Sequence, residues 1–237
     1  MAAPAFYLTL RDALLDLIQR DQLPRPGCLP AERWLAEHFQ TTRVTLRQAL
    51  TQLESEGVIY RQHRKGWFVA PKKLVYEPVQ DVSFTRYVTA QGRVPQTEVL
   101  GFVQLAAEER IAHQLELQPG EPVYRLIRRR FIDQRLVLVE RVWMNARYLP
   151  QLEQQRFDQS LWRVFEEVYG IQLIDKQITL TPTALQHEEA AALCVTPGSP
   201  GLYITRRSAT AQSEVIEYDE EYWLQDVMTV RITTQHA

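Results

Sequence analysis

The sequence predicts an α+β protein of two domains, and three observations support this fold class. Residues 1–71 contain three amphipathic segments with helical spacing, followed by two short apolar runs on either side of a basic turn. Beyond residue 79, strand-like segments alternate with helical ones. Between these parts, residues 72–78 have the composition of a linker. We therefore expect a small, mostly helical domain at 1–71 and a larger mixed domain at 79–237.

The N-terminal domain begins with a helix expected at residues 6–20. A short helix follows Pro30, and a third begins near Thr41, a residue type that caps helix N-termini. Residues 58–60 and 67–69 are expected to pair as a small hairpin. The apolar residues of the helices recur at positions that share one face: Leu10, Leu14, Leu17, Leu35, Phe39, Leu46, Ala49, Leu50 and Leu53.

Basic side chains gather on the parts of this domain that the leucines leave exposed. Arg43 and Arg47 are four residues apart and share the helix face opposite the leucines. The hairpin tip at 63–66 reads His-Arg-Lys-Gly. Guanidinium groups bind guanine through two hydrogen bonds, and a basic tip suits phosphates or the minor groove. Any single arginine is better explained as a solvated surface residue, but their combination in this order of elements favours a DNA-binding domain.

Bulk properties agree with that interpretation. Residues 1–73 carry 11 Lys or Arg against 7 Asp or Glu, although the whole chain has a formal net charge of −2. A basic N-terminal part followed by an acidic remainder indicates that only the N-terminal part binds a polyanion. The sequence has no membrane-length apolar run and no signal-peptide pattern at its N-terminus. Cys28 and Cys194 are expected to be free, buried thiols, which fits a cytoplasmic protein.

The C-terminal domain alternates strands and helices and contains two long hairpins. Strands are expected at residues 94–103, 123–132, 136–145, 171–180, 202–209, 215–223 and 228–232, and helices at 107–115, 160–169 and 185–193. The last strand, 228–232, is expected to close the sheet.

A weak internal repeat relates the two halves of this domain. Residues 115–122 resemble residues 193–200, 78 positions later, and both segments contain a Pro-Gly turn. The same offset places Arg128 opposite Arg206. Each copy runs helix, turn, strand, hairpin, strand, which predicts one domain with pseudo-twofold symmetry.

Two arginines on one strand suggest a binding site in this domain. Arg128 and Arg130 are two residues apart, so both lie on the same face of their strand. Arginines on an interior face need an anionic partner, either a carboxylate of the chain or a bound anion. Glu140, on the paired strand, is a candidate acceptor, as is Glu217, which falls opposite it in the repeat after a one-residue gap. An internal Arg–Glu cluster, a solvated sheet face and an anion-binding pocket are the open alternatives.

Three segments of the N-terminal domain carry a family resemblance. LPAERWLA at 29–36, TRVTLRQAL at 42–50 and LESEGVI at 53–59 resemble the winged helix-turn-helix domain of the GntR family of bacterial regulators. Two features depart from the family pattern: Ala31 stands where a capping serine is common, and the wing lacks the usual Gly-x-Gly-Thr. The DNA contacts implied by the resemblance come from Arg33, Arg43, Thr45, Arg47, His63, Arg64, Lys65 and Gly66.

The C-terminal domain resembles the UTRA ligand-sensing domain of the HutC subfamily. The resemblance rests on SFT at 83–85, LQPGEPV at 117–123, RRR at 128–130, LVE at 138–140, SLW at 160–162 and EY at 217–218. It implies a fold like that of chorismate lyase, an antiparallel sheet with flanking helices and an effector pocket on the sheet. The pocket residues that it implies are Phe84, Thr85, Arg128, Arg130, Glu140, Ser160, Trp162, Glu217 and Trp223.

Other chemistry finds no support in the sequence. The five histidines have no metal-ligand spacing, and glycine-rich phosphate loops and Gly-x-Ser-x-Gly turns are absent. We therefore expect no metal, no cofactor and no catalytic residues.

Together these features predict a ligand-responsive transcriptional repressor. It is expected to be a homodimer that binds a palindromic double-stranded operator and senses a small anionic metabolite, such as a sugar phosphate, a phosphonate or an organic acid. Two alternatives from other classes are an enzyme with a lyase-like pocket and a nucleoid-type DNA binder without an effector.

Overall fold

The computed structural model describes residues 6–20, 23, 27–62, 65–78 and 83–234. The chain divides into two compact units, one formed by residues 1–73 with 225–227 and the other by residues 74–224 with 228–237. Within the described ranges, no helix combines the length and the apolar composition that a membrane span requires.

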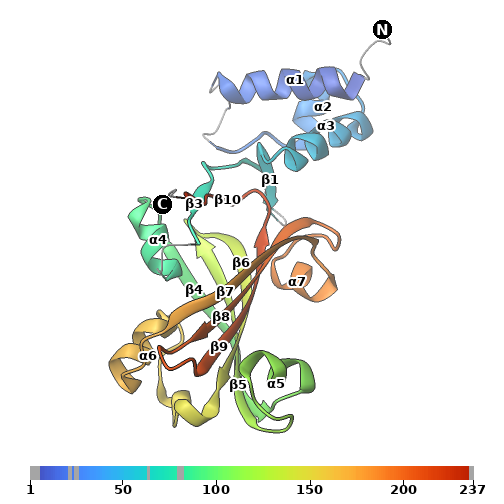
Figure 1. The fold of residues 1–237 in the computed structure, drawn as a ribbon. Coiled ribbons are helices and arrows are strands. Elements are labelled where there is room, and N and C mark those ends of the chain that lie inside the picture. The colour runs from blue at the N-terminus through green and yellow to red at the C-terminus, as the bar shows by residue number, and fades with distance from the viewer. Residues whose placement is uncertain (1–5, 21–22, 24–26, 63–64, 79–82, 235–237) are drawn as a thin grey trace. The chain divides into compact units, whose positions relative to one another are not determined.

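Three helices and a two-stranded antiparallel hairpin form the first unit (Figure 1). They are α1 (Phe6–Gln19), α2 (Glu32–His38), α3 (Arg43–Ser55), β1 (Ile59–Gln62) and β2 (Gly66–Val69). The expected leucine faces meet in one core, in which Leu14, Leu35, Leu46 and Leu50 are completely buried. Leu17 is an exception: it is half-buried and lies outside this core, against which Leu15 and Ile18 pack. The order of elements is the one that the sequence predicts.

A six-stranded antiparallel sheet in the order β4-β5-β6-β9-β8-β7 dominates the second unit. The strands are β4 (Pro95–Ala106), β5 (Pro122–Ile132), β6 (Arg135–Asn145), β7 (Ile174–Ala184), β8 (Pro200–Ala209) and β9 (Val215–Leu224). The predicted internal repeat is present as β4-α5-β5-β6 and β7-α7-β8-β9. Because β6 pairs with β9, the two copies meet at the centre of the sheet.

Helices cover both faces of this sheet, with α4 and α6 on one side and α5 and α7 on the other (Figure 1). Their bounds are α4 (Phe84–Ala90), α5 (Glu109–Leu115), α6 (Leu161–Tyr169) and α7 (His187–Ala192), with short 3-10 turns at Ala146–Tyr148 and Leu152–Gln154. α6 packs Leu161, Val164 and Phe165 against β5 and β6. Helix α4, which contains Phe84 and Thr85, was not predicted from the sequence.

One expectation about the sheet is wrong. The segment expected to close the sheet forms β10 (Met228–Val230), which instead pairs in parallel with β3 (Leu74–Tyr76) as a separate ribbon. The reason is that β9 already has a neighbour on each side, so the strand after it finds no free edge there. β3 itself lies inside the stretch expected to be a linker.

The cysteines are free, as expected, but neither is buried. Cys28 is half-buried, and its Sγ lies 3.5 Å from the carbonyl oxygen of Leu29. Cys194 is exposed in the turn after α7, where its φ of 57° places it in the left-handed region.

Candidate functional site

Helix α3 presents an arginine face to solvent. Its N-cap is Thr42, whose hydroxyl accepts a hydrogen bond from the Thr45 backbone N–H at 3.2 Å, and not Thr41 as expected. Arg43 and Arg47 are both exposed on the side opposite the buried leucines. The helix is therefore fixed by its apolar side and leaves two guanidinium groups available on the other.

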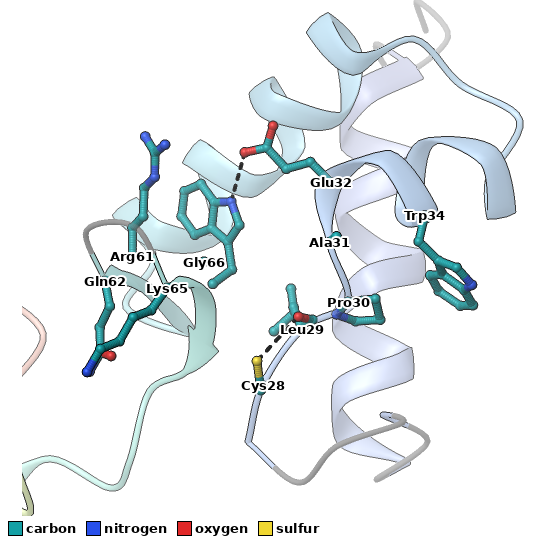
Figure 2. Close-up of a pocket in the computed structure, with 11 residues that line it drawn as sticks. Cys28, Leu29, Pro30, Ala31, Glu32, Trp34, Arg61, Gln62, Lys65 and Gly66 are labelled. Atoms are coloured by element: carbon teal, nitrogen blue, oxygen red, sulfur yellow. Dashed lines mark hydrogen bonds between the residues drawn. The ribbon is translucent and has the colours of Figure 1, made fainter.

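Glu32 connects three elements of the first unit. Its carboxylate accepts hydrogen bonds from Arg47 Nε on α3 at 2.8 Å and from Trp67 Nε1 on β2 at 3.1 Å, the second drawn in Figure 2. Burial acts to raise the pKa of Glu32, but the hydrogen bonds from Arg47 and Trp67 outweigh it and hold that pKa below its ordinary value. Trp67, the residue after Gly66 of the hairpin tip, thus helps to orient Glu32, which in turn binds Arg47.

Of the remaining predicted DNA contacts, Thr45 is half-buried with its hydroxyl 3.0 Å from that of Thr42, and the others lie on exposed positions or outside the described residues. Arg33 is 77% exposed and pairs with Glu37 along α2. Lys65 and Gly66 are exposed at the hairpin, where Gly66 has a φ of +105° that favours glycine. His63 and Arg64 lie outside the described residues. Ala31 provides no side-chain cap to α2, as its residue type implies.

A pocket of about 680 Å³ lies between the start of α2 and the hairpin (Figure 2). It combines apolar groups with two basic side chains of the hairpin, Arg61 and Lys65. Arg61 also lies over the ring of Trp67, 5.8 Å from its centroid. The pocket thus borders the same surface as the predicted wing contacts.

The second unit contains a small polar cavity on the sheet face that α4 and α6 cover. Its volume is about 50 Å³, room for about two water molecules. It is lined by Ser83, Phe84, Thr85, Tyr87, Arg128, Arg130, Leu138, Glu140, Ser160, Leu161, Trp162, Arg206, Glu217, Asp219 and Glu221. The structure thus brings together eight of the nine residues predicted for the effector pocket.

The two predicted arginines share one carboxylate. Arg128 lies opposite Glu140 in the β5–β6 register and forms an ion pair with it, and Arg130 Nη2 lies 2.8 Å from Glu140 Oε1. Burial acts to raise the pKa of Glu140, but the two arginines outweigh it and lower that pKa. The internal Arg–Glu cluster and the pocket, alternatives in the sequence, are therefore the same group of residues.

Each arginine also has a second anchor. Arg128 Nη1 donates to the backbone carbonyls of Phe157 and Gln159, both at 3.1 Å. Arg130 Nη1 donates to Thr97 Oγ1 at 2.7 Å, and its guanidinium lies 5.0 Å from the ring centroid of Phe84. Arg128 thus also holds the segment before α6, whereas the second anchor of Arg130 consists of side chains alone.

Trp223 does not line the cavity, contrary to the expectation that it closes the pocket. Its indole is buried, and Nε1 donates to Glu221 Oε2 at 2.6 Å. The ring lies 6.1 Å from that of Phe84. Trp223 therefore packs behind the lining and orients Glu221.

Two acidic groups of the cavity, Asp219 and Glu221, were not predicted from the sequence, and Arg206 was not predicted as part of the site. The β8–β9 register pairs Arg206 with Asp219, as β5–β6 pairs Arg128 with Glu140. The counterpart of Glu140 in the repeat is therefore Asp219, and not Glu217 as expected. Burial and the neighbouring carboxylates raise the pKa of Asp219 well above its ordinary range, against the opposite effect of Arg206.

A wider cleft of about 1240 Å³ adjoins the small cavity. The two share Ser83, Thr85, Ser160 and Trp162 as lining residues. Small-molecule sites usually occupy about 300–1,000 Å³, so the cavity alone is too small for a metabolite. The charged residues that line the cavity, which we call the cavity floor, therefore lie beside the open space of the cleft.

Comparison with known proteins gives matches over both units. Residues 6–69 match the family described as bacterial regulatory proteins, gntR family, and residues 90–229 match the UTRA domain. The sequence is 30% identical over 214 residues to the uncharacterized HTH-type transcriptional regulator YihL of Escherichia coli (strain K12), covering 88% of this chain and 89% of the relative. It is 26% identical over 218 residues to the mannosyl-D-glycerate transport/metabolism system repressor MngR of the same strain, covering 92% and 91%.

The fold also resembles a solved structure. The crystal structure of PhnF from Mycobacterium smegmatis superposes with a TM-score of 0.68 at 26% identity, covering 96% of this chain and 100% of that one. The separate effector domain of PhnF matches 68% of this chain with a TM-score of 0.61. Both the helical unit and the sheet unit therefore have relatives of the same architecture.

Proposed function

Because the chain belongs to the gntR family of bacterial regulatory proteins and carries a UTRA domain, we propose that it is a transcriptional repressor controlled by a small metabolite. The observation that supports this most directly is the coexistence of an exposed arginine face on α3 with a buried charged cavity in the second unit. YihL and MngR are named as a regulator and a repressor, so the relatives argue against the enzyme alternative.

The first unit supplies the DNA contacts in this proposal. Arg43 and Arg47 bind base edges in the major groove, and Thr45 and Arg33 contact the DNA near them. The wing, with His63, Arg64, Lys65 and Gly66, contacts phosphates or the minor groove. A homodimer in the cytoplasm presents two such units to a palindromic double-stranded operator.

The second unit binds the effector. The anionic end of the effector lies at Arg128 and Arg130, and the rest of the effector occupies the adjoining cleft between α4 and α6. A sugar phosphate, a phosphonate or an organic acid fits this chemistry, and MngR is named as the repressor of a mannosyl-D-glycerate transport/metabolism system. Binding shifts the population of conformations and with it the affinity for the operator.

The effector site is tested by a thermal-shift screen of small anions on the full chain, because a ligand that binds only the native state raises the melting temperature. Arg130→Gln should abolish the rise given by a hit. Arg129→Gln is the matched control, since Arg129 is the next residue, faces the other side of β5 and pairs with Glu98 at 3.6 Å. Equal loss in both variants, or none in either, would count against the site.

The DNA-binding role is tested by selecting bound sequences from a random library with the full chain. Recovery of a palindromic consensus supports the repressor. Salt-sensitive binding without any consensus would favour the nucleoid-type alternative. A hit from the thermal-shift screen should then change the affinity for the selected sequence.

A further inference from the structure

The charges on the cavity floor are unevenly divided. At one end, Arg128 and Arg130 share Glu140, so positive charge is in excess. The other end, which we call the acidic end, contains one arginine and three carboxylates: Arg206, Glu217, Asp219 and Glu221. With all seven groups ionised, four carboxylates would face three guanidinium groups, and this crowding of carboxylates together with burial is what raises the pKa of Asp219. An effector that brings only negative charge would enlarge this imbalance in a buried site.

The acidic end also contains an unsatisfied acceptor. Asp219 is 6% exposed, and its Oδ1 has no hydrogen-bond partner within the described part of the chain. Arg206, opposite it in register, donates instead to the Tyr76 hydroxyl at 2.7 Å and lies 3.7 Å from Glu221. Buried polar atoms are nearly always hydrogen-bonded, so a buried oxygen without a donor in a ligand cavity indicates that the ligand supplies it.

Resting on the proposed function, we infer that the acidic end is a subsite for an ammonium group, and that the effector is zwitterionic. Its anionic group lies at Arg128 and Arg130, and its ammonium group donates to Asp219 Oδ1. An ammonium group has three N–H donors and no acceptor, which suits a point where carboxylates converge. It also balances the excess negative charge.

A divalent metal ion fits the same place less well. Oxygens of Glu140, Asp219 and Glu221 all lie within 4.8 Å of one another. However, Glu140 is already bound by two guanidinium groups, and Glu221 Oε2 accepts from the Trp223 indole. Calcium takes about six to eight oxygen ligands and magnesium about six, so a metal would have to break these contacts. An ammonium group leaves them intact.

The test uses matched pairs of probes on the full chain. ω-Aminoalkyl phosphates with about two to four carbons are compared with n-alkyl phosphates of equal length, and ω-amino acids with the corresponding alkanoates, by thermal shift and calorimetry. We expect the amine-bearing member of at least one pair to bind about tenfold or more tightly, because a charge-assisted hydrogen bond in a buried site has that effect. Asp219→Asn should remove this preference.

Asp219→Asn is close in size to the wild-type side chain and removes an unsatisfied buried charge, so its ligand-free melting temperature should equal or exceed that of the wild type. The control is Glu220→Gln, on the next residue and the opposite face, where the carboxylate is bonded by Arg110, Trp143 and Tyr203. That variant should melt lower and keep the amine preference.

Three results would overturn the inference. One is that no amine-bearing probe binds better than its amine-free partner, and another is that Asp219→Asn destabilises the fold as much as Glu220→Gln. The third is stabilisation by millimolar CaCl₂ or MnCl₂ that Asp219→Asn abolishes, without any amine effect, which would identify a metal site. If alkyl phosphates stabilise the wild type and lose their effect in Arg130→Gln, the proposed function survives any of these results.

Discussion

The two faces of the six-stranded sheet differ in how their buried carboxylates are hydrogen-bonded. Glu220 and Asp219 are neighbours on β9, and only 3% and 6% of their surfaces are exposed. Glu220 receives hydrogen bonds from Arg110, Trp143 and Tyr203 at 2.8–2.9 Å, whereas Asp219 Oδ1 receives none. The face toward α5 and α7 thus satisfies its charge within the chain, and the face toward α4 and α6 leaves an acceptor for something else. The comparison teaches that burial alone does not separate a structural carboxylate from a binding one.

The largest expected effect on stability comes from removing the hydrogen-bonded carboxylate of Glu220, on the face toward α5 and α7. Glu220→Ala leaves the Trp143 and Tyr203 donors without their acceptor, and should lower the free energy of unfolding by about 3–5 kcal/mol. Thermal and urea unfolding of the full chain measure this loss. An unchanged transition would show that the Glu220 hydrogen bonds add nothing to stability, and the contrast between the faces would disappear.

Arg128→Ala removes from the cavity the arginine that also binds the segment before α6. It leaves the carbonyls of Phe157 and Gln159 without their donor, so we expect a loss of about 2–3 kcal/mol in stability. It should also abolish the ligand-induced rise in melting temperature while leaving operator binding intact. If the ligand-free melting temperature falls but the ligand-induced rise remains, Arg128 is only a structural residue.

The same contrast occurs on α3, where Arg47 is bound by Glu32 and Arg43 forms no ion pair within the described ranges. Alanine at either position should cost about 1–3 kcal/mol of discrimination at one half-site base pair. Only Arg47→Ala should also lower the melting temperature, because it removes a partner of Glu32. Titration with the selected operator and with random DNA measures the first effect, and Arg20→Ala serves as an exposed control. Unchanged affinity for both DNAs in both variants would refute the recognition-helix assignment.

The smallest effect concerns pH and the acidic end. Since the pKa of Asp219 is raised in the folded state, its contribution to stability is complete below its ordinary pKa of 3.8 and is lost as the pH rises through the raised value. The melting temperature of Asp219→Asn should therefore rise relative to that of the wild type as the pH increases above about 4. A constant difference would mean that Asp219 titrates normally. The charged groups that face Asp219 are Glu140, Glu217, Glu221 and Arg206.

Strand parity and apolar spacing were enough to predict much of the fold and part of the cavity. Parity placed Arg128 and Arg130 on one face, and the leucine spacing gave α1, α2 and α3. Asp219 and Glu221 share the parity of Glu217 on β9, so parity also places them on the cavity face, but the repeat alignment pointed to Glu217 alone. The partner of Arg206 depends on register: the turn at 210–214 is longer than the turn at 133–134, which moves this partner to Asp219.

Other misses have a similar physical origin. Helix α4 contains the β-branched residues Thr85, Val88 and Thr89, and Ser83 forms no side-chain cap, so its local signals are weak. Tertiary contacts, such as that between Phe84 and Arg130, decide its placement. β10 was assigned to the main sheet because its apolar pattern suits any sheet, and only the strand order shows that no edge beside β9 is free.

The pairing of β6 with β9 has a consequence for the shape of the binding site. Each half of the sheet places an arginine opposite a carboxylate on neighbouring strands: Arg128 opposite Glu140, and Arg206 opposite Asp219. Because the halves meet at the centre of the sheet, both pairs open into one cavity. Each end of a bound molecule therefore meets a different half of the sheet, so a substitution in one half changes the groups at one end of the cavity and leaves those at the other end in place.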